Sequence, residues 1–190
     1  MRSDVMDPYN NINNYRFMVT EAYSPAEVLV AYYGTEEDPE ADFPYNFELI
    51  ELTSENLSGT TIRDMVELWL SNVPEGEWPN FVLGNHDNWR IADRIGFLYK
   101  RCMNVLLLTL PGTPTTYYGE EIGMENIYVS YNDTRDPEAK RNPCCWKEYT
   151  RDPERSPMQW TPDPPSAGFS TTNETWLPVN DNYLEGINVE

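Results

Sequence analysis

Short apolar runs alternate with helical patterns through the first two thirds of the chain. The apolar runs predict buried strands at residues 16–19, 43–49, 81–83 and 105–110. Between them, apolar residues recur at helical spacing over residues 25–33, 58–70 and 91–101. Strands that alternate with helices are typical of βα units and a parallel sheet. Residues 1–125 are therefore predicted to adopt an α/β fold.

The character of the sequence changes after Glu125. Pro, Asn, Asp and Trp dominate as far as Glu190, and regular periodicity fades. Segments of this kind usually run over the surface and carry binding residues. We interpret residues 126–190 as a long elaborated loop over an active-site face and not as an independent domain.

The composition is that of a folded, acidic protein. The 190 residues are 39% apolar and 13% aromatic, which is enough to fill a core. Thirteen Lys and Arg against 32 Asp and Glu give a formal net charge of −19, which repels phosphate backbones and anionic lipids. We therefore expect no nucleic-acid partner, and a neutral ligand such as a sugar held by hydrogen bonds and aromatic faces.

Targeting and modification signals are sparse. The first residues show no signal-peptide core, and no apolar run is long enough to span a bilayer. Sequons at Asn56, Asn132 and Asn173 favour a secreted chain. Of the three cysteines, Cys144 and Cys145 are adjacent, and adjacent cysteines bond each other only with strain.

Polar side chains follow two of the predicted strands. Glu21 comes after the first strand, and Asn85, His86 and Asp87 come directly after the third. Parallel α/β proteins build their sites at these strand ends, although such a carboxylate can also simply cap the next helix. The pairing of His86 with Asp87 favours function over a structural histidine. Two acidic groups at strand ends predict acid/base chemistry on a neutral substrate.

Other chemistries find no support in the sequence. One histidine and scattered carboxylates form no recognisable metal-ligand spacing. The chain also has neither a Gly-rich phosphate loop nor a serine nucleophile elbow. We therefore expect neither a metal nor a cofactor in this segment.

Four motifs carry a more specific resemblance. Residues 19–23 (VTEAY), 81–87 (FVLGNHD) and 112–124 (GTPTTYYGEEIGM) resemble the motifs of the fifth, seventh and eighth barrel strands in the α-amylase superfamily of glycoside hydrolases. Residues 155–160 (RSPMQW) resemble the signature of its α-glucosidase and oligo-1,6-glucosidase branch, and the insect maltases are the nearest match. The resemblance implies a partial TIM (β/α)8 barrel, roughly strands five to eight, followed by the long C-terminal loop.

The resemblance also implies roles for individual residues in a retaining mechanism. Glu21 matches the general acid/base, and Asp87 matches the carboxylate that stabilises the transition state. His86 matches a residue that binds hydroxyl groups of the cleaved sugar. Arg155 resembles the arginine that orients Asp87 and the sugar, and Arg151 is expected to border the leaving-group subsite. The calcium loop of this branch would lie upstream, so no cofactor is expected here.

Large side chains of the same motifs also have structural interpretations. We expect Tyr117 and Tyr118 to pack at the end of the last strand in preference to stacking on sugar. Met158 and Trp160 are interpreted as the core of the loop.

The sequence departs from the family pattern at the nucleophile. In this family the nucleophilic Asp follows a Phe-Arg-x motif ahead of the fifth strand, but only residues 1–15 precede that position here. Asp4 and Asp7 lack this context, so we assign no nucleophile. The first half of the barrel and the following β domain are also absent. We therefore expect residues 1–190 alone to be inactive, and unstable because four strands leave two open edges.

Three functions remain open. The first is a secreted or extracellular membrane-associated α-glucosidase that hydrolyses terminal α-linked glucose from maltose, sucrose or short oligosaccharides. The second is the ectodomain of an amino-acid transporter heavy chain, which resembles the same branch, and the third is a non-catalytic carbohydrate-binding protein. Retention of Glu21, His86, Asp87 and Arg155 favours the enzyme. Membrane anchoring is expected only through segments outside this chain.

Overall fold

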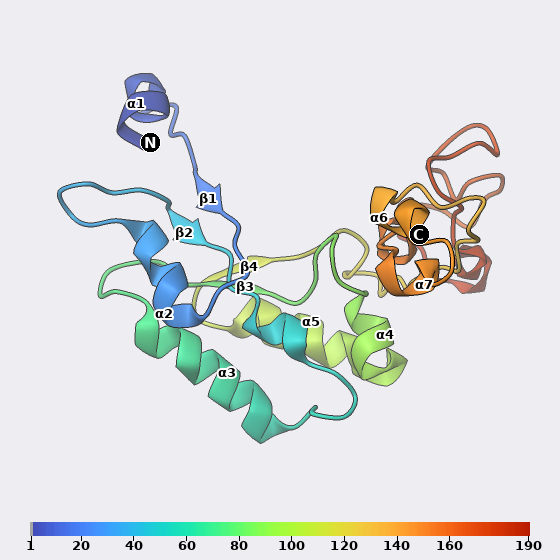
Figure 1. The fold of residues 1–190 in the computed structure, drawn as a ribbon, viewed down its shortest axis with the longest axis horizontal. Coiled ribbons are helices and arrows are strands. Elements are labelled where there is room, and N and C mark those ends of the chain that lie inside the picture. Colours follow the sequence, from blue (N-terminus) through green and yellow to red (C-terminus); the bar gives the residue numbers. More distant parts are fainter. Residues whose placement is uncertain (1) are drawn as a thin grey trace. The chain divides into compact units, whose positions relative to one another are not determined.

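The computed structural model describes residues 2–190, which form two compact units. Among the described residues, one unit consists of residues 2–52, Asn56–Val82 and Leu107–Thr115. The other consists of Thr53–Glu55, Leu83–Leu106 and Thr116–Glu190. Figure 1 shows the elements of both units, coloured along the chain.

The strands of the first unit form two parallel pairs. β1 (Val19–Thr20) pairs with β2 (Phe43–Pro44), and β3 (Asn80–Val82) pairs with β4 (Thr113–Thr115). Parallel neighbours need a long crossover, and helices lie in the segment between the two strands of each pair. The structure therefore agrees with the predicted α/β class, although its strands are shorter than predicted.

One buried side chain connects the two strand pairs. Asn80, at the start of β3, accepts a hydrogen bond from the backbone N–H of Asn46 through Oδ1 at 3.3 Å. Its Nδ2 donates to the carbonyl of Thr113 at 2.9 Å and to the hydroxyl of Thr115 at 2.8 Å. Because a buried amide needs partners for all its polar atoms, Asn80 is suited to join these backbones in the interior.

Helices of the first unit follow the local signals in the sequence. α3 (Gly59–Asn72) begins after Ser58, whose hydroxyl accepts a hydrogen bond from the backbone N–H of Thr61 at 3.0 Å. α3 lies beside α2 in Figure 1 and buries Trp69 completely. The helix predicted at residues 58–70 is confirmed. The remaining helices of this unit are α1 (Arg2–Val5), η1 (Asp7–Tyr9), α2 (Ala26–Leu29), η2 (Val30–Tyr33) and η3 (Glu48–Glu51), of which α2 and η2 together confirm the prediction for residues 25–33.

The predicted strands at residues 16–19 and 43–49 were too long. The first strand starts only at Val19, and the second ends at Pro44. Proline has no backbone N–H to continue a ladder. Two residues later, the side chain of Asn46 accepts the N–H of Glu48 at 3.0 Å, where the 3-10 helix η3 begins. This local hydrogen bond competes with strand pairing and turns the chain.

The strand predicted at residues 105–110 is wrong. This run belongs to α5 (Lys100–Thr109), and the last strand of the chain is β4. Met103 and Leu107, one helical turn apart, are buried, whereas Val105 is 63% exposed. A short apolar run fits either a buried strand or a helix. Here the helix already begins at Lys100, before the apolar run, and continues through it to Thr109.

Gly112 fixes where β4 begins. Its φ is 149°, and a Cβ at this position would meet the carbonyl of Pro79. The next residue, Thr113, donates its N–H to that same carbonyl at 2.8 Å. The close approach at Gly112 therefore sets the register of β4 against β3.

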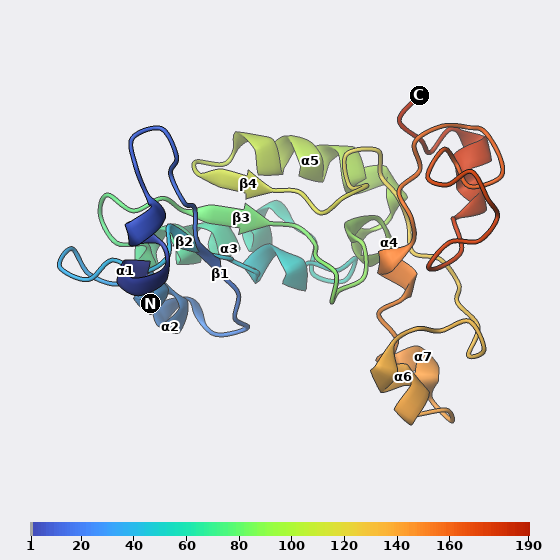
Figure 2. The ribbon, with the colours of Figure 1, turned by 90° about the horizontal axis from the view of Figure 1, so that it is seen from above.

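The second unit contains short helices and long irregular segments. Its helices are α4 (Ile91–Ile95), η4 (Phe97–Tyr99), most of α5, α6 (Pro137–Arg141), α7 (Trp146–Tyr149), η5 (Pro153–Arg155) and η6 (Asp181–Glu185). α6 and α7 lie side by side in Figure 2. The helix predicted at residues 91–101 is found, but it breaks at Gly96, where φ is 92°. No helix within residues 2–190 is long and apolar enough to cross a membrane.

The helical assignment of residues 105–110 is testable with two matched truncations. We expect Leu107→Ala to lower the free energy of unfolding by about 2–5 kcal/mol, because the side chain is 1% exposed. Val105→Ala should change it by less than about 0.5 kcal/mol, because in a helix this side chain faces away from Leu107. A strand would place both side chains on the same face, so comparable losses in denaturant unfolding would contradict the helix.

Candidate active site

Asp87 lies in a tight polar turn that follows β3. The side-chain oxygen of Asn85 accepts the backbone N–H of Asp87 at 3.0 Å and the side-chain amide of Asn88 at 2.9 Å. Asn85 thus closes the turn on itself, as short polar side chains do. Gly84 precedes it, and a Cβ there would collide with the carboxylate of Glu120. The sequence Gly-Asn-His-Asp therefore fixes the backbone from which Asp87 and His86 project.

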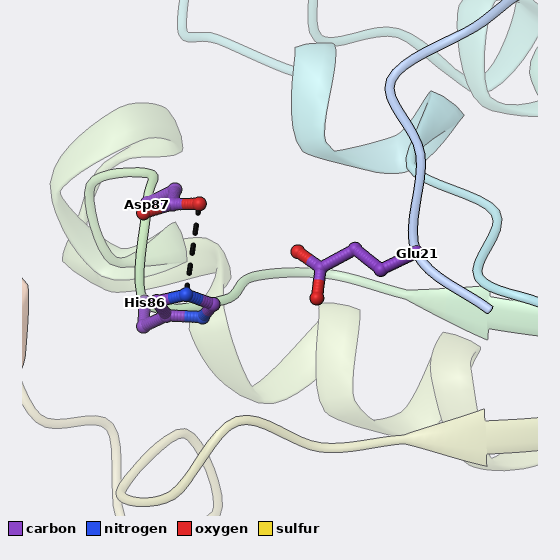
Figure 3. A group of neighbouring side chains, drawn as sticks. All are labelled: Glu21, His86 and Asp87. Atoms are coloured by element: carbon purple, nitrogen blue, oxygen red, sulfur yellow. Dashed lines mark ion pairs between the residues drawn. The ribbon is translucent and has the colours of Figure 1, made fainter. Parts of the chain in front are cut away.

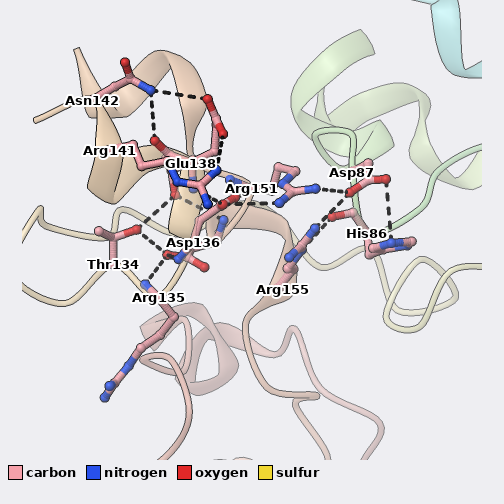
Figure 4. A network of polar contacts seen from close by, with 12 residues as sticks. His86, Asp87, Thr134, Arg135, Asp136, Glu138, Arg141, Asn142, Arg151 and Arg155 are labelled. Atoms are coloured by element: carbon pink, nitrogen blue, oxygen red, sulfur yellow. Dashed lines mark hydrogen bonds and ion pairs between the residues drawn. The ribbon is translucent and has the colours of Figure 1, made fainter.

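Two arginines hold the same oxygen of Asp87. Arg151 Nη1 donates to Oδ1 at 2.8 Å, and Arg155 Nη2 donates to Oδ1 at 2.9 Å. Arg155 Nε also donates to the backbone carbonyl of His86 at 2.6 Å. Oδ2 lies 3.6 Å from His86 Nε2 (Figures 3 and 4). The carboxylate is therefore orientated by charge-assisted hydrogen bonds on one side and by the imidazole on the other.

Arg151 is itself held by a buried carboxylate. Asp136 accepts the guanidinium through both oxygens, from Nε at 2.8 Å and from Nη2 at 3.2 Å, and also accepts the backbone N–H of Arg151 at 3.0 Å (Figure 4). Burial alone would raise the pKa of Asp136, but hydrogen bonds from Arg151 and from the N–H groups of Glu138 and Arg151 lower it to about 2. The same contacts raise the pKa of Arg151. This ion pair keeps Arg151 directed at Asp87.

A second buried aspartate anchors the segment that carries Asp136. Asp152 Oδ2 accepts hydrogen bonds from the hydroxyl of Thr134 at 2.5 Å and from the N–H groups of Arg135 at 2.6 Å and Asp136 at 3.1 Å. The sequence interpretation missed both Asp136 and Asp152. Each of them directly precedes a proline at the start of a short helix, and this Asp-Pro pattern is a signal that could have identified them.

Arg90 and two tyrosines lie beneath the loop that carries Arg155. The buried guanidinium of Arg90 donates to the carbonyl of Tyr118 at 2.7 Å and stands over the rings of Tyr117 and Tyr118. The tyrosine hydroxyls donate to the carbonyls of Glu154 at 3.3 Å and of Ser156 at 2.6 Å, on either side of Arg155. Tyr117 packs against Arg90 and Tyr118 as predicted, whereas Tyr118 is 37% exposed, so its packing in preference to sugar stacking stays a prediction. Both hydroxyls also position the arginine loop.

Two buried glutamates share this interior. Burial, opposed by a hydrogen bond from the N–H of Tyr117, raises the pKa of Glu120 to about 7. Burial likewise raises the pKa of Glu154 to about 8, and its carboxylate oxygens accept no hydrogen bond from any other residue among 2–190. Because burial disfavours the charged form of a carboxyl group, Glu154 favours the protonated form at neutral pH, whereas Glu120, which accepts the N–H of Tyr117, titrates close to neutral pH.

The large side chains of the signature at residues 155–160 divide between core and surface. Met158 is buried, as expected, but Trp160 is 48% exposed, so its interpretation as loop core is wrong. Trp160 lines a cavity of about 390 Å³ together with Tyr118, Phe169 and Trp176, and Arg155 forms part of its wall. An apolar, aromatic cavity next to a charged group is typical of small-ligand sites.

Glu21 belongs to the other compact unit. It follows β1, where Thr20 accepts the N–H of Tyr45 at 2.9 Å, and its side chain is exposed (Figure 3). Four of the five predicted site residues, His86, Asp87, Arg151 and Arg155, are thus brought together within one unit. That Glu21 acts with them stays a prediction.

The chain matches a known family over its described length. The family model for the alpha amylase catalytic domain matches residues 2–190. Salivary alpha-glucosidase of Anopheles gambiae is 44% identical over 95% of this chain, and Maltase 1 of Drosophila virilis is 42% identical over 95%. The human amino acid transporter heavy chain SLC3A1 is 43% identical over 97%. The chain spans 31%, 29% and 25% of these three relatives, respectively.

Solved structures give the same result for the fold. The alpha-glucosyl transfer enzyme XgtA superposes with a TM-score of 0.74 at 29% identity, covering 90% of this chain and 31% of its own. Trehalulose synthase MutB from Pseudomonas mesoacidophila MX-45 superposes with a TM-score of 0.76 at 26% identity, covering 93% and 37%. These enzymes are TIM barrels, so the fold of this chain is consistent with part of such a barrel.

The raised pKa of Glu154 predicts how stability depends on pH. The pKa of Glu154 is about 8 in the folded protein, above its ordinary value of 4.5. Its contribution to the free energy of unfolding is therefore complete below about pH 4.5 and is lost as the pH rises through about 8. We expect Glu154→Gln, which is neutral and of the same shape, to flatten the decline in unfolding free energy between about pH 5 and about pH 9. Urea unfolding of both proteins across this range measures the effect, and parallel pH curves would contradict it.

Proposed function

Because this chain belongs to the α-amylase family, as part of its catalytic domain, we propose that it forms the sugar-binding half of an α-glucosidase active site. The enzyme would hydrolyse terminal α-linked glucose from maltose, sucrose or short oligosaccharides with retention of configuration. The chain spans less than a third of its relatives, so the proposal concerns the full-length protein.

The arrangement around Asp87 carries the proposal. Its Oδ1 is occupied by Arg151 and Arg155, while Oδ2 and the half-exposed imidazole of His86 lie beside each other. A carboxylate oxygen next to an imidazole nitrogen offers an acceptor and a donor for neighbouring hydroxyl groups of one sugar ring. Positive charge that develops at the anomeric carbon would be stabilised by the fixed carboxylate of Asp87.

In the proposed mechanism Glu21 acts as the general acid/base. It would protonate the glycosidic oxygen as the bond to the leaving sugar breaks, and later remove a proton from the attacking water. The retaining reaction also needs a nucleophilic carboxylate, which we assign to no residue of this chain. Arg151 and Arg155 act by positioning Asp87, and Arg151 would border the leaving-group subsite.

A partner protein of an amino-acid transporter is the second candidate. The observation that favours it is the 43% identity to SLC3A1, which lies between the 44% identity to salivary alpha-glucosidase of Anopheles gambiae and the 42% identity to Maltase 1 of Drosophila virilis. Retention of His86, Asp87, Arg151 and Arg155 in one connected network supports the hydrolase instead. A carbohydrate-binding protein without catalysis would keep the same network, and a hydrolysis assay of the full-length protein separates it from the enzyme.

Secretion or an extracellular, membrane-associated location is part of the same proposal. Relatives named salivary alpha-glucosidase, in Anopheles gambiae and Aedes aegypti, support it. An oligosaccharide is the expected small-molecule partner, and nucleic acid is not expected because of the acidic composition.

The role of Arg155 is tested by Arg155→Leu in the full-length protein. We expect kcat/KM on maltose to fall by about 10²–10³-fold, because Oδ1 of Asp87 loses one of its two charged donors. The matched control is Arg141→Leu, which removes an exposed arginine paired only with Glu138 at 3.5 Å among the ion pairs of residues 2–190 and should leave kcat/KM unchanged. Thermal unfolding must show that both variants fold. Unchanged turnover in a folded Arg155→Leu protein would reject the assigned role.

A further inference from the structure

Two adjacent cysteines lie in the turn between α6 and α7. The sulfur atoms of Cys144 and Cys145 are 3.0 Å apart, closer than two unbonded sulfur atoms normally approach. Cys144 is exposed and Cys145 is half-buried, so small molecules in solution can reach the pair. No part of the proposed glycosidase mechanism uses either thiol.

We propose that Cys144 and Cys145 form a redox-active dithiol that a small disulfide, such as glutathione disulfide, oxidises to a disulfide between neighbouring residues. In the first step the Cys144 thiolate attacks one sulfur of the oxidant and expels one glutathione thiolate. In the second step the Cys145 thiolate attacks the Cys144 sulfur and expels the other. The two thiol protons pass through solvent to the two expelled glutathione thiolates, and two electrons pass from the cysteines to the oxidant, which leaves as two molecules of reduced glutathione.

The order of the two steps follows from the local contacts. The hydrogen bond with Cys144, followed by burial, raises the pKa of the Cys145 thiol. Cys144 is also the more exposed of the two residues. Cys144 is therefore the attacking thiol, and Cys145 is the resolving thiol beside it.

The surrounding backbone keeps the two sulfur atoms together. Pro143 restricts the chain immediately before Cys144. Cys145 is the N-cap residue of α7; its N–H donates to the carbonyl of Asn142 at 3.2 Å, and its carbonyl accepts the N–H of Glu148 at 2.9 Å. Thiols fixed at such a distance react as an intramolecular pair, which favours ring closure over addition of a second glutathione.

The resulting bond is expected to be reversible. Neighbouring Cα atoms are about 3.8 Å apart across a trans peptide, below the range of about 4.4–6.8 Å that disulfides prefer. Exposed and strained disulfides are reduced more easily than structural ones. The pair therefore responds to the thiol–disulfide balance of its surroundings instead of acting as a permanent crosslink. This proposal does not depend on the proposed glycosidase activity.

Peptide mapping tests the proposal directly. The reduced full-length protein is incubated with glutathione disulfide under native conditions, quenched with acid, alkylated and digested with trypsin. Cleavage after Arg141 and Lys147 places both cysteines in one peptide, residues 142–147, while Cys102 lies in another. We expect peptide 142–147 to lose the mass of two hydrogen atoms and to carry no glutathione. A peptide that carries glutathione, or that is crosslinked to Cys102 or to a second chain, would overturn the proposal.

Matched variants identify the contribution of each thiol. In Cys145→Ser, Cys144 has no resolving partner and should retain one glutathione. Cys102→Ser should leave the oxidation of peptide 142–147 unchanged. In the wild-type protein unfolded by denaturant, the disulfide between Cys144 and Cys145 should form more slowly by about tenfold or more, because the turn no longer holds the sulfur atoms together. Equal rates in the folded and unfolded chain would contradict the role given to the turn.

Discussion

The carboxylate of Asp87 has a fixed orientation because two positively charged side chains bind the same oxygen. Arg151 and Arg155 both donate to Oδ1, yet two guanidinium groups repel each other at this distance. The buried Asp136 offsets this repulsion by binding Arg151 through both carboxylate oxygens. Asp152 in turn fixes the backbone that carries Asp136. The site is therefore an alternating series of charges, and each member depends on the next.

The loop that carries Arg155 is also supported by residues to which the proposed mechanism gives no role in sugar binding. The guanidinium of Arg90 stacks on the rings of Tyr117 and Tyr118, and the tyrosine hydroxyls donate to backbone carbonyls on both sides of Arg155. A chain with only 13 basic residues places three arginines in this small region. Most of the acidic excess lies elsewhere, so the proposed sugar site is locally balanced although the protein as a whole is strongly acidic.

Local signals predicted some elements well and others badly. The helix after Ser58 could be predicted because its cap and its apolar spacing lie within a few residues of each other. The run at residues 105–110 could not, because a buried helix and a buried strand have the same apolar composition over six residues. Trp160 was misplaced for a related reason: a large aromatic residue is usually buried, and its exposure beside a cavity depends on neighbours far along the chain.

The sequence alone determined the family and the class of fold and supplied the candidate site residues, because these follow from motifs in which neighbouring residues act together. His86 and Asp87 are consecutive, and Arg155 begins its own signature. Only the tertiary structure decided that Arg151 and Arg155 share one oxygen of Asp87, and that Asp136 and Asp152 hold them there. These contacts join residues up to 68 positions apart. Such distances depend on how the whole unit packs, and no spacing within the sequence encodes them.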